Sequence, residues 1–441
     1  MPNRKVITCM LLATLLTLTG CSAFLQKEIT DKNHEWDLSW GEETSQSENT
    51  SQSEMPFPSE SVSQDGEHEP EGETEPIAEQ IKSMSIEEKI GQMVIAGLNG
   101  YEIDENTRAM IENYNIGGFI LFSRNVENSG QLLALINSLK RTNSKNKVPL
   151  FISIDEEGGR ISRMPEELAK IPSNKEIGKV NNSDLSYKIG GILAEELKLF
   201  GFNMDFAPVM DINSNPNNPV IGDRSFGTKA EVVTKLGIQT MKGIQAGGII
   251  PVVKHFPGHG DTSVDSHAGL PVVDNDMNRL KSFELVPFSE AVKSGADAVM
   301  IAHILLKSID PQNPASLSET IITDILRKQL GFNGVVISDD MTMGAIEKNY
   351  IVSDAAVKSI NAGTDIVLVC HGYDKQVAVI NALRSAYEAG IISRERIDES
   401  VYRILKLKNK YNLSDTEINS VNVEEVNARI LDVLDLITNM Q

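Results

Sequence analysis

Cysteine is scarce in this sequence, which contains only three in 441 residues. Cys9 and Cys21 fall near the amino terminus, so Cys370 is the only cysteine in the part of the chain that has the composition of a folded domain. An intramolecular disulfide in that part is excluded, and a large domain can bury enough apolar surface without one. Free cysteine behaves as a small apolar side chain, so we expect Cys370 to be buried.

Basic residues are absent between Asn33 and Ile81, a segment that carries fourteen aspartates and glutamates in a chain of formal net charge −21. Its other residues are mostly Ser, Gln, Gly and Pro, which bury too little apolar surface to offset the entropy of ordering. We therefore expect residues 21–81 to form an acidic, disordered linker. Nucleic acid is not expected as a partner of so anionic a chain.

The amino terminus lacks an apolar run that could cross a bilayer as a finished helix. The run from Cys9 to Leu18 has ten residues, whereas a transmembrane helix needs about 20. Two basic residues precede it, as in an export signal. Leu18-Thr19-Gly20-Cys21 resembles a bacterial lipobox, which implies a signal peptide over residues 1–20 and lipidation of Cys21. Several acyl chains would anchor the protein in the cell membrane, facing the extracytoplasmic side.

From residue 82 onward, short apolar runs alternate with longer segments of helical periodicity. Ser85 followed by Glu88 is a capping-box signature at the start of the first helical segment. Eight apolar runs are expected to be strands: residues 93–98, 116–122, 148–155, 202–211, 248–255, 298–303, 334–339 and 366–370. Parallel strands covered on both faces are nearly all apolar, so eight strand–helix units indicate an α/β fold, a (β/α)8 TIM-type barrel over residues 82–412.

A doubly wound open sheet is the rival architecture, but the sequence has no Gly-rich dinucleotide-binding fingerprint after the first strand run. Polar residues instead follow or end many of the predicted strands: Asp155, Asp211, Lys254, His255, His303 and Asp339. In a barrel these positions meet at one rim, where such folds carry their chemistry. Residues 413–441 are expected to form a helical tail, because apolar residues from Val423 to Ile437 recur at helical spacing. A second large domain is not expected.

The run from Lys254 to Pro271 contains three of the chain's seven histidines and two aspartates within eighteen residues. A buried strand has no use for so many hydrogen-bonding side chains, because unpaired buried polar groups are costly. The run therefore indicates a chemical function. Gly258 and Gly260 are expected to let it swing over a bound ligand.

Four segments together resemble glycoside hydrolase family 3, in its β-N-acetylglucosaminidase branch. They are residues 154–163 (IDEEGGRISR), residues 221–227 (IGDRSFG), the run over residues 254–271, and residues 336–343 (VISDDMTM). The resemblance extends over residues 84–411 and implies a β-N-acetylhexosaminidase that uses no cofactor and no metal. Glu156 departs from the pattern, since the family often has glutamine there.

The resemblance implies that Asp339 is the nucleophile that forms a covalent glycosyl-enzyme, and that His267 paired with Asp265 is the acid and base. Glycoside hydrolysis needs a carboxylate near the anomeric carbon and a proton donor at the leaving oxygen. Free imidazole, with a pKa of ~6.5, can donate and then accept a proton near neutral pH, and an adjacent carboxylate can orient the ring. The neighbouring Asp340 is expected to cap the helix that follows.

The resemblance also assigns sugar-binding roles to five side chains: Asp155, Arg163, Arg224, Lys254 and His255. Carboxylates accept hydrogen bonds from sugar hydroxyls, while Arg and Lys donate to hydroxyl and acetyl oxygens. An alternative for Arg224 is a structural ion pair with Asp223 or Asp211. His259 and Asp261 are expected to shape the loop. The expected substrate is terminal β-linked N-acetylglucosamine on a cell-wall muropeptide, and the expected enzyme is a monomer.

Two other functions stay open from the residues alone. A metal-dependent hydrolase on a TIM barrel could draw its ligands from five side chains, although Lys254 would repel a cation: His255, His259, Asp261, Asp265 and His267. A non-catalytic sugar-binding lipoprotein would normally have two lobes. The sequence also leaves open phosphate as the acceptor, and attack by the acetamide of the substrate itself; of the two nucleophiles we predict Asp339.

Overall fold

The computed structural model of the chain describes residues 71–440, with side chains from residue 76 onward. The predicted signal peptide, the lipidation site Cys21 and most of the acidic linker lie outside the described residues. The predicted end of the linker at residue 81 is wrong, because the segment before it already belongs to helix α1 (Glu71–Ser83), which packs on α13 (Arg394–Lys410). Ile77 and Ile81, one turn apart, are buried, so two apolar contacts hold a helix of otherwise acidic composition against the domain.

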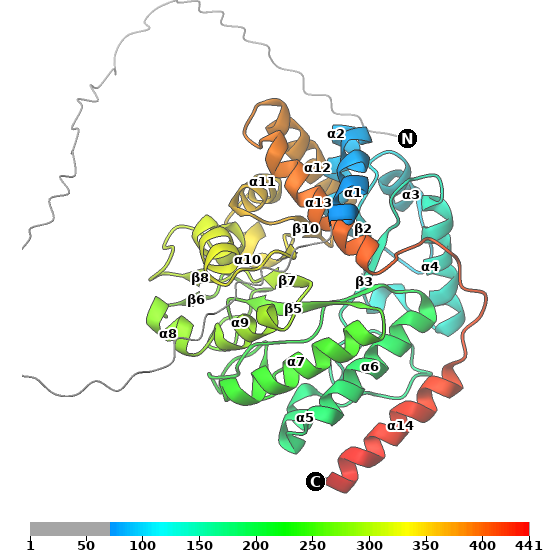
Figure 1. Ribbon diagram of the computed structural model, residues 1–441, viewed down its shortest axis with the longest axis vertical. Helices are drawn as coiled ribbons and strands as arrows, with labels where there is room; N and C mark the ends of the chain where they lie inside the picture. Colours follow the sequence, from blue (N-terminus) through cyan, green and yellow to red (C-terminus); the bar gives the residue numbers. More distant parts are fainter. Residues whose placement is uncertain (1–70, 441) are drawn as a thin grey trace, which may run out of the picture. The chain divides into compact units, whose positions relative to one another are not determined.

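The parallel strands close into a barrel in the order β1-β10-β9-β7-β5-β4-β3-β2, at the centre of Figure 1. They are β1 (Val94–Gly97), β2 (Gly118–Leu121), β3 (Phe151–Ile154), β4 (Met204–Asp205), β5 (Ile250–Phe256), β7 (Ala298–Ile301), β9 (Val335–Asp340) and β10 (Ile366–Val369). Each overlaps one of the eight predicted runs. The predicted (β/α)8 TIM-type barrel is therefore confirmed.

The strand pairing is regular on one side of the barrel and interrupted on the other. β2 and β3 pair without a break from Gly118 opposite Phe151 to Leu121 opposite Ile154. The register shifts along β5 beyond Val253, and again where β10 pairs with β9 beyond Ile366. Breaks of this kind re-aim side chains at barrel rims. Both fall on strands that carry predicted site residues.

Helices surround the barrel, as Figure 1 shows. Besides α1 and α13 they are α2 (Ile86–Gln92), α3 (Glu105–Glu112), α4 (Ser129–Asn143), α5 (Asn174–Val180), α6 (Ser183–Phe200), α7 (Ala230–Ala246), α8 (Met277–Ser282), α9 (Val286–Lys293), the π-helix η4 (Thr320–Gln329), α10 (Gly344–Glu347), α11 (Val352–Ala362), α12 (Tyr373–Glu388) and α14 (Val423–Met440). The predicted capping box is present on α2: the Glu88 N–H donates to Ser85 Oγ at 3.2 Å, and the Ser85 N–H donates to Glu88 Oε2 at 2.7 Å.

The predicted helix of the tail is α14, which lies against α6 near the C mark in Figure 1. Val426, Ile430 and Val433 are buried on one face of it, as the helical spacing predicts. A second small sheet, β6 (Val272–Val273) with β8 (Leu305–Leu306), was not predicted. Two-residue strands are too short to give a periodic pattern.

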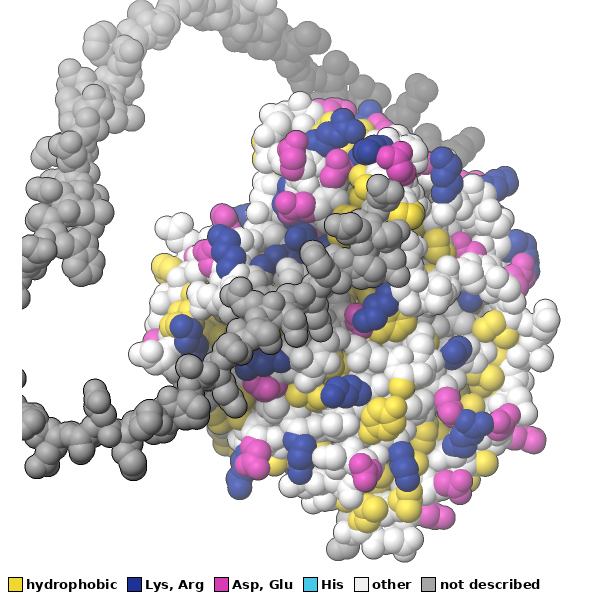
Figure 2. Space-filling view, in the orientation of Figure 1, with side chains coloured by type: hydrophobic (Ala, Val, Ile, Leu, Met, Phe, Trp, Pro, Cys, Tyr) yellow, Lys and Arg dark blue, Asp and Glu magenta, His cyan; other side chains and the backbone are white. Residues whose placement is uncertain are grey.

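On the face shown in Figure 2, Lys and Arg side chains are interspersed with Asp and Glu. A face with mixed charges gives little long-range steering of charged partners. Of the helices in residues 71–440, none combines the length and apolar character that crossing a membrane requires.

Candidate active site

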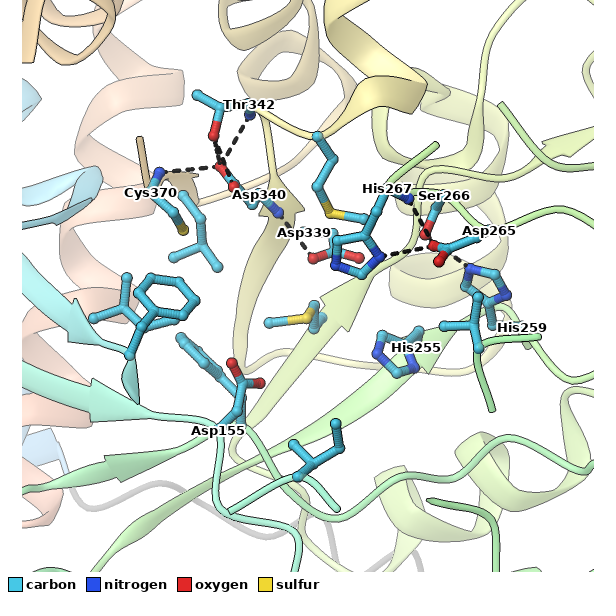
Figure 3. A pocket seen from close by; sticks show the side chains of 18 of the residues that line it. Asp155, His255, His259, Asp265, Ser266, His267, Asp339, Asp340, Thr342 and Cys370 are labelled. Atoms are coloured by element: carbon cyan, nitrogen blue, oxygen red, sulfur yellow. Dashed lines mark hydrogen bonds and ion pairs between the residues drawn. The ribbon is translucent and has the colours of Figure 1, made fainter. Parts of the chain in front are cut away.

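The carboxyl ends of the barrel strands surround a cavity of about 350 Å³, shown in Figure 3. Seven of the eight predicted catalytic and sugar-binding residues line it: Asp155, Arg163, Arg224, His255, Asp265, His267 and Asp339. The eighth, Lys254, lies behind the wall, and its Nζ is 2.7 Å from Asp155 Oδ1. The structure therefore brings together side chains from segments that are far apart in the sequence.

Asp339 is at the end of β9, where the rigid strand fixes its carboxylate at the cavity. The N–H of Asp340 donates to Asp339 Oδ1 at 2.9 Å. Burial alone would raise the pKa of Asp339, but the nearby imidazoles of His303 and His255 and this N–H outweigh burial and lower it. A lowered pKa keeps the carboxylate ionised at neutral pH, as a nucleophile requires.

His267 lies in the loop after β5 and forms a pair with Asp265. Its Nδ1 donates to Asp265 Oδ1 at 2.8 Å, because an ionised carboxylate can only accept. Burial would raise the pKa of Asp265, but the hydrogen bonds from His267 lower it overall. His267 and Asp339 are close together in Figure 3 and line the same cavity. The predicted acid–base pair therefore faces the predicted nucleophile.

The glycines of this loop occupy positions where a larger residue would clash or be strained. A Cβ built on Gly260 would lie 1.7 Å from the carbonyl oxygen of Ile212. Gly258 has a φ of +128° and lies against Glu284, a backbone conformation that other residues rarely adopt. Both glycines allow close packing at the base of the loop.

Arg224, Lys254 and Glu157 form a buried ion-pair network at the wall of the cavity. Arg224 donates to both oxygens of Glu157, at 2.9 and 2.8 Å, and Lys254 Nζ lies 2.7 Å from Glu157 Oε1. Burial would raise the pKa of Glu157, but the two cations outweigh it and lower the pKa well below the usual range. Burial would likewise lower the pKa of Lys254, yet Asp155 and Glu157 raise it overall. All three groups are therefore ionised.

Glu157 was missed by the sequence analysis, and the partners proposed for Arg224 were wrong. Asp223 pairs with Arg160 instead, and Asp211 pairs with His255. A signal existed, since the two cations expected inside the barrel needed more counter-charge than Asp155 supplies. The turn after β3 decides which neighbouring acid supplies this counter-charge. The sequence pattern did not define the geometry of that turn.

Asp211 holds two histidines in place. His255 Nδ1 donates to Asp211 Oδ2 at 2.6 Å, and the N–H of His259 donates to Asp211 Oδ1 at 2.6 Å. His255 Nε2 then accepts from Arg224 at 3.2 Å. Burial and the neighbouring His255 lower the pKa of His259 to about 4, so this histidine is neutral at pH 7.

His259 and Asp261 contact other residues of the loop region, as predicted. His259 Nδ1 is 2.8 Å from Thr262 Oγ1 and its Nε2 is 3.1 Å from Ser266 Oγ. Asp261 accepts from Asn275 at 3.2 Å. The two residues therefore shape the segment that presents His267.

Glu156 turns away from the cavity into a buried group of acids. It accepts from the N–H of Arg163 at 2.7 Å, and the N–H of Glu156 donates to Asp205 Oδ1 at 3.0 Å. Burial raises the pKa of Glu156 to about 7 and raises the pKa values of Asp205 and Glu196 beside it. The departure from glutamine at this position therefore adds a titratable group to this buried acidic cluster.

Asp340 does not cap a helix, contrary to the prediction. It accepts from the N–H of Thr342 at 2.9 Å and from the N–H of Cys370 at 3.0 Å, while α10 begins only at Gly344. His303 Nε2 donates to the carbonyl oxygen of Asp340 at 3.0 Å. These contacts brace the residue next to the nucleophile. Cys370 is buried, as predicted.

The sequence matches the Glycosyl hydrolase family 3 N terminal domain over residues 85–407. The chain therefore belongs to glycoside hydrolase family 3. It is 39% identical over 325 residues to "Beta-hexosaminidase A" of Pseudoalteromonas piscicida, covering 68% of this chain and 54% of that protein. The chain thus spans about half the length of that relative. It is 35% identical to a "Beta-hexosaminidase" of Methylobacillus flagellatus, covering 67% of this chain and 85% of the other.

Solved structures agree with this placement. A glycoside hydrolase family 3 β-N-acetylglucosaminidase from Paenibacillus sp. superposes with a TM-score of 0.76 at 41% identity, over 80% of this chain and 68% of that one. NagZ from Neisseria gonorrhoeae, solved with N-trifluoroacetyl-D-glucosamine, gives a TM-score of 0.63 at 31% identity, over 79% and 97% of the two chains. The barrel fold is therefore shared with proteins of this family.

Proposed function

We propose that this protein is a retaining exo-β-N-acetylglucosaminidase, which hydrolyses terminal β-linked N-acetylglucosamine. The observation that carries the proposal is the position of Asp339 in the same cavity as the Asp265–His267 pair. A carboxylate and a proton donor around one site are the two groups that this hydrolysis requires. The β-N-acetylglucosaminidase from Paenibacillus supports the choice of sugar.

The reaction has two steps. In the first, a carboxylate oxygen of Asp339 bonds to the anomeric carbon while the glycosidic bond breaks, and protonated His267 gives its Nε2 proton to the leaving oxygen. In the second, neutral His267 takes a proton from water, whose oxygen bonds to the anomeric carbon and releases Asp339 as a carboxylate. Two inversions retain the configuration. Asp265 accepts from Nδ1 throughout and stabilises the imidazolium.

Direct attack by Asp339 is favoured over attack by the acetamide of the substrate. The lowered pKa of Asp339 keeps it anionic, and its position on a strand limits the motion of its carboxylate. Both properties suit a group that forms a bond to carbon.

The charged network at the wall of the cavity suits recognition of one terminal sugar. Asp155 and Arg163 line the cavity, and Lys254 pairs with Asp155 from behind. A carboxylate held by a buried cation is an acceptor for two sugar hydroxyls, and Arg163 can donate to the acetyl oxygen. Arg224 and His255 complete the wall, with their mutual contact fixing both.

The biological setting is also a proposal. The lipobox at Cys21 supports a lipoprotein on the extracytoplasmic side of the cell membrane, with residues 22–70 as a tether. A monomer held there would meet muropeptide fragments, which expose terminal N-acetylglucosamine. Two measurements test the anchor. Globomycin should block processing of the signal peptide, and Cys21→Ala should abolish membrane attachment. Attachment that persists in the variant contradicts the anchor.

A metal-dependent hydrolase is the weaker candidate. Both ring nitrogens of His255 and of His259 lie within hydrogen-bond distance of protein atoms, and the Lys254 ammonium lies between Asp155 and Glu157. These contacts occupy both ring nitrogens of two of the candidate ligands, His255 and His259, and place a positive charge next to His255 in the chain. Activity that disappears with a chelator and returns with a divalent metal would favour this candidate.

The rate on an aryl N-acetylglucosaminide against an aryl glucoside tests the proposed substrate. We expect a preference of about 100-fold or more for the acetamido sugar, because a site that hydrogen-bonds a group rejects ligands without it. Asp339→Asn should abolish turnover of both. Equal, measurable rates on the two substrates would contradict the assigned sugar. Negligible rates on both would favour a non-catalytic sugar-binding protein.

His267→Ala tests the acid role separately. We expect its activity to fall by about 100-fold or more on a natural glycoside, the range of general acid catalysis, and to fall far less on a dinitrophenyl glycoside, which leaves without a proton. Equal losses on both substrates would remove His267 from this role.

A further inference from the structure

We infer that α10 and the residue after it, Lys348, form a docking platform that holds the loop of residues 265–269 over the cavity. Gly344 and Lys348 are then positioning residues for His267. The inference rests on the proposed acid–base role of His267, and adds to it the contacts that place the imidazole beside Asp339.

Two hydrogen bonds join the platform to the loop. The N–H of Ala345 donates to the carbonyl oxygen of Ser266 at 3.0 Å, and Lys348 Nζ donates to that of Ala268 at 2.6 Å. The acceptors flank His267 in the chain. Fixing the peptide groups on both sides of a residue restricts its own backbone, so these bonds limit where the imidazole can lie.

The third contact is a close approach that only glycine permits. A Cβ built on Gly344 would lie 2.4 Å from the carbonyl oxygen of His267 and 3.2 Å from its carbonyl carbon. The obstructing atoms belong to the backbone, so a side chain at residue 344 must push the loop outward. Several glycines of the chain have a positive φ, but Gly344 is not one of them. Glycine is therefore needed at this position for space and not for its backbone conformation.

The platform is rigidly connected to the nucleophile. Asp339 and Gly344 are separated by four residues, and this short segment is held by Asp340, whose side chain accepts from Thr342 and Cys370. His303 donates to the carbonyl oxygen of Asp340. One braced segment thus carries the nucleophile at one end and the support for His267 at the other.

Within the loop, Asp265 holds the ring and the N–H of His267, but Asp265 belongs to the same loop and moves with it. Ser263, Val264, His267 and Ala268 are exposed. On the inner side, His259 Nε2 contacts Ser266 Oγ, and Figure 3 shows these residues on the side of the cavity away from Asp155. Loss of the platform contacts would therefore free the imidazole more than the base of the loop.

The test compares kcat/KM on a glycoside with a poor leaving group and on a dinitrophenyl glycoside. Gly344→Ala should lose about tenfold or more on the poor leaving group, part of the effect of general acid catalysis, and less than about threefold on the dinitrophenyl glycoside. Lys348→Met should change the ratio in the same direction by a smaller factor. Gly191→Ala, where a Cβ meets nothing within 4 Å, and the surface variant Lys328→Met are the matched controls.

Each outcome identifies which idea fails. If His267→Ala changes the ratio while Gly344→Ala and Lys348→Met match their controls, the platform is contradicted and the acid role stands. If His267→Ala leaves the ratio unchanged, the acid role itself is wrong. If Gly344→Ala fails to fold, the ratio measured for Lys348→Met decides, and a value equal to that of Lys328→Met overturns the inference.

Discussion

His267 and Asp265 are joined through a single carboxylate oxygen, which accepts from the Nδ1 of His267 and from its backbone N–H, each at 2.8 Å. One oxygen therefore fixes both the backbone position of residue 267 and the orientation of its ring. The other ring nitrogen, Nε2, is left on the side away from Asp265. This is the geometry that a proton donor to a leaving group needs.

Asp265→Asn should lower kcat by about 100-fold on a glycoside with a poor leaving group, because an amide neither stabilises the imidazolium nor enforces the Nδ1–H tautomer. KM should change little, since Asp265 is not assigned to the sugar. Steady-state kinetics of the variant beside Asp274→Asn, a nearby change outside the site, measures this. An unchanged kcat would show that Asp265 only shapes the loop.

Asp339 should stay reactive in acid. Its pKa is lowered from the usual ~3.9, so the nucleophilic, deprotonated form is complete at pH 5 and is lost only as the pH falls below about 4. In His267→Ala, where proton donation is removed, kcat/KM on a dinitrophenyl glycoside should therefore be nearly constant between pH 8 and pH 5. A decline by half or more within that window would contradict the lowered pKa.

Glu156→Gln should make stability less dependent on pH. The pKa of Glu156 is raised to about 7, so between about pH 4.3 and pH 7 the folded state keeps a proton that the unfolded state has released. The contribution of Glu156 to the free energy of unfolding is fully present at low pH and is lost as the pH rises through that window. Above about pH 7 this contribution no longer changes with pH. The raised pKa values of Asp205 and Glu196 act in the same direction.

The melting temperature measures this effect. We expect Glu156→Gln to melt a few degrees above the wild type at pH 8 and close to it at pH 4.5, since about 1 kcal/mol moves the Tm of a large domain by 2–4 °C. Glu166→Gln, at an exposed position, is the control. Parallel curves for the wild type and Glu156→Gln would contradict burial as the cause of the raised pKa.

Glu157→Gln should be among the most destabilising single changes. It leaves Arg224 and Lys254 buried with less counter-charge, and breaking a buried ion pair costs about 3–5 kcal/mol. Asp223→Asn, which breaks the exposed pair with Arg160, should cost no more than about 1 kcal/mol. Urea unfolding of both variants measures the difference, and equal midpoints would show that the network is not needed for stability.

The barrel could be predicted from the sequence because its strands are short, apolar and separated by helical segments. That alternation also indicated which residues lie at the carboxyl ends of the strands. Asp155, His255 and Asp339 were identified as candidate site residues at such positions. Helix α1 was missed for the opposite reason. Its two buried isoleucines stand in a segment whose composition is that of a linker, and only their contact with the domain orders it.

The ion-pair network and the platform could not be predicted, because they depend on distances between segments far apart in the chain. Lys348 meets Ala268 across 80 positions, and nothing in either local sequence indicates the partner. Asp155, Glu156 and Glu157 are consecutive, yet one faces the cavity, one enters an acidic cluster and one pairs with two cations. The turn after β3 makes that division, and its geometry is tertiary.

The most direct measurement is the identity of the residue that becomes glycosylated. Incubation with a slow, fluorinated N-acetylglucosamine analogue that has a good leaving group, followed by peptide mass spectrometry, should place one glycosyl mass on Asp339. The label should be absent from Asp339→Asn and should form in His267→Ala. A label on another residue, or full turnover of substrate with none on Asp339, would contradict the central role of this carboxylate.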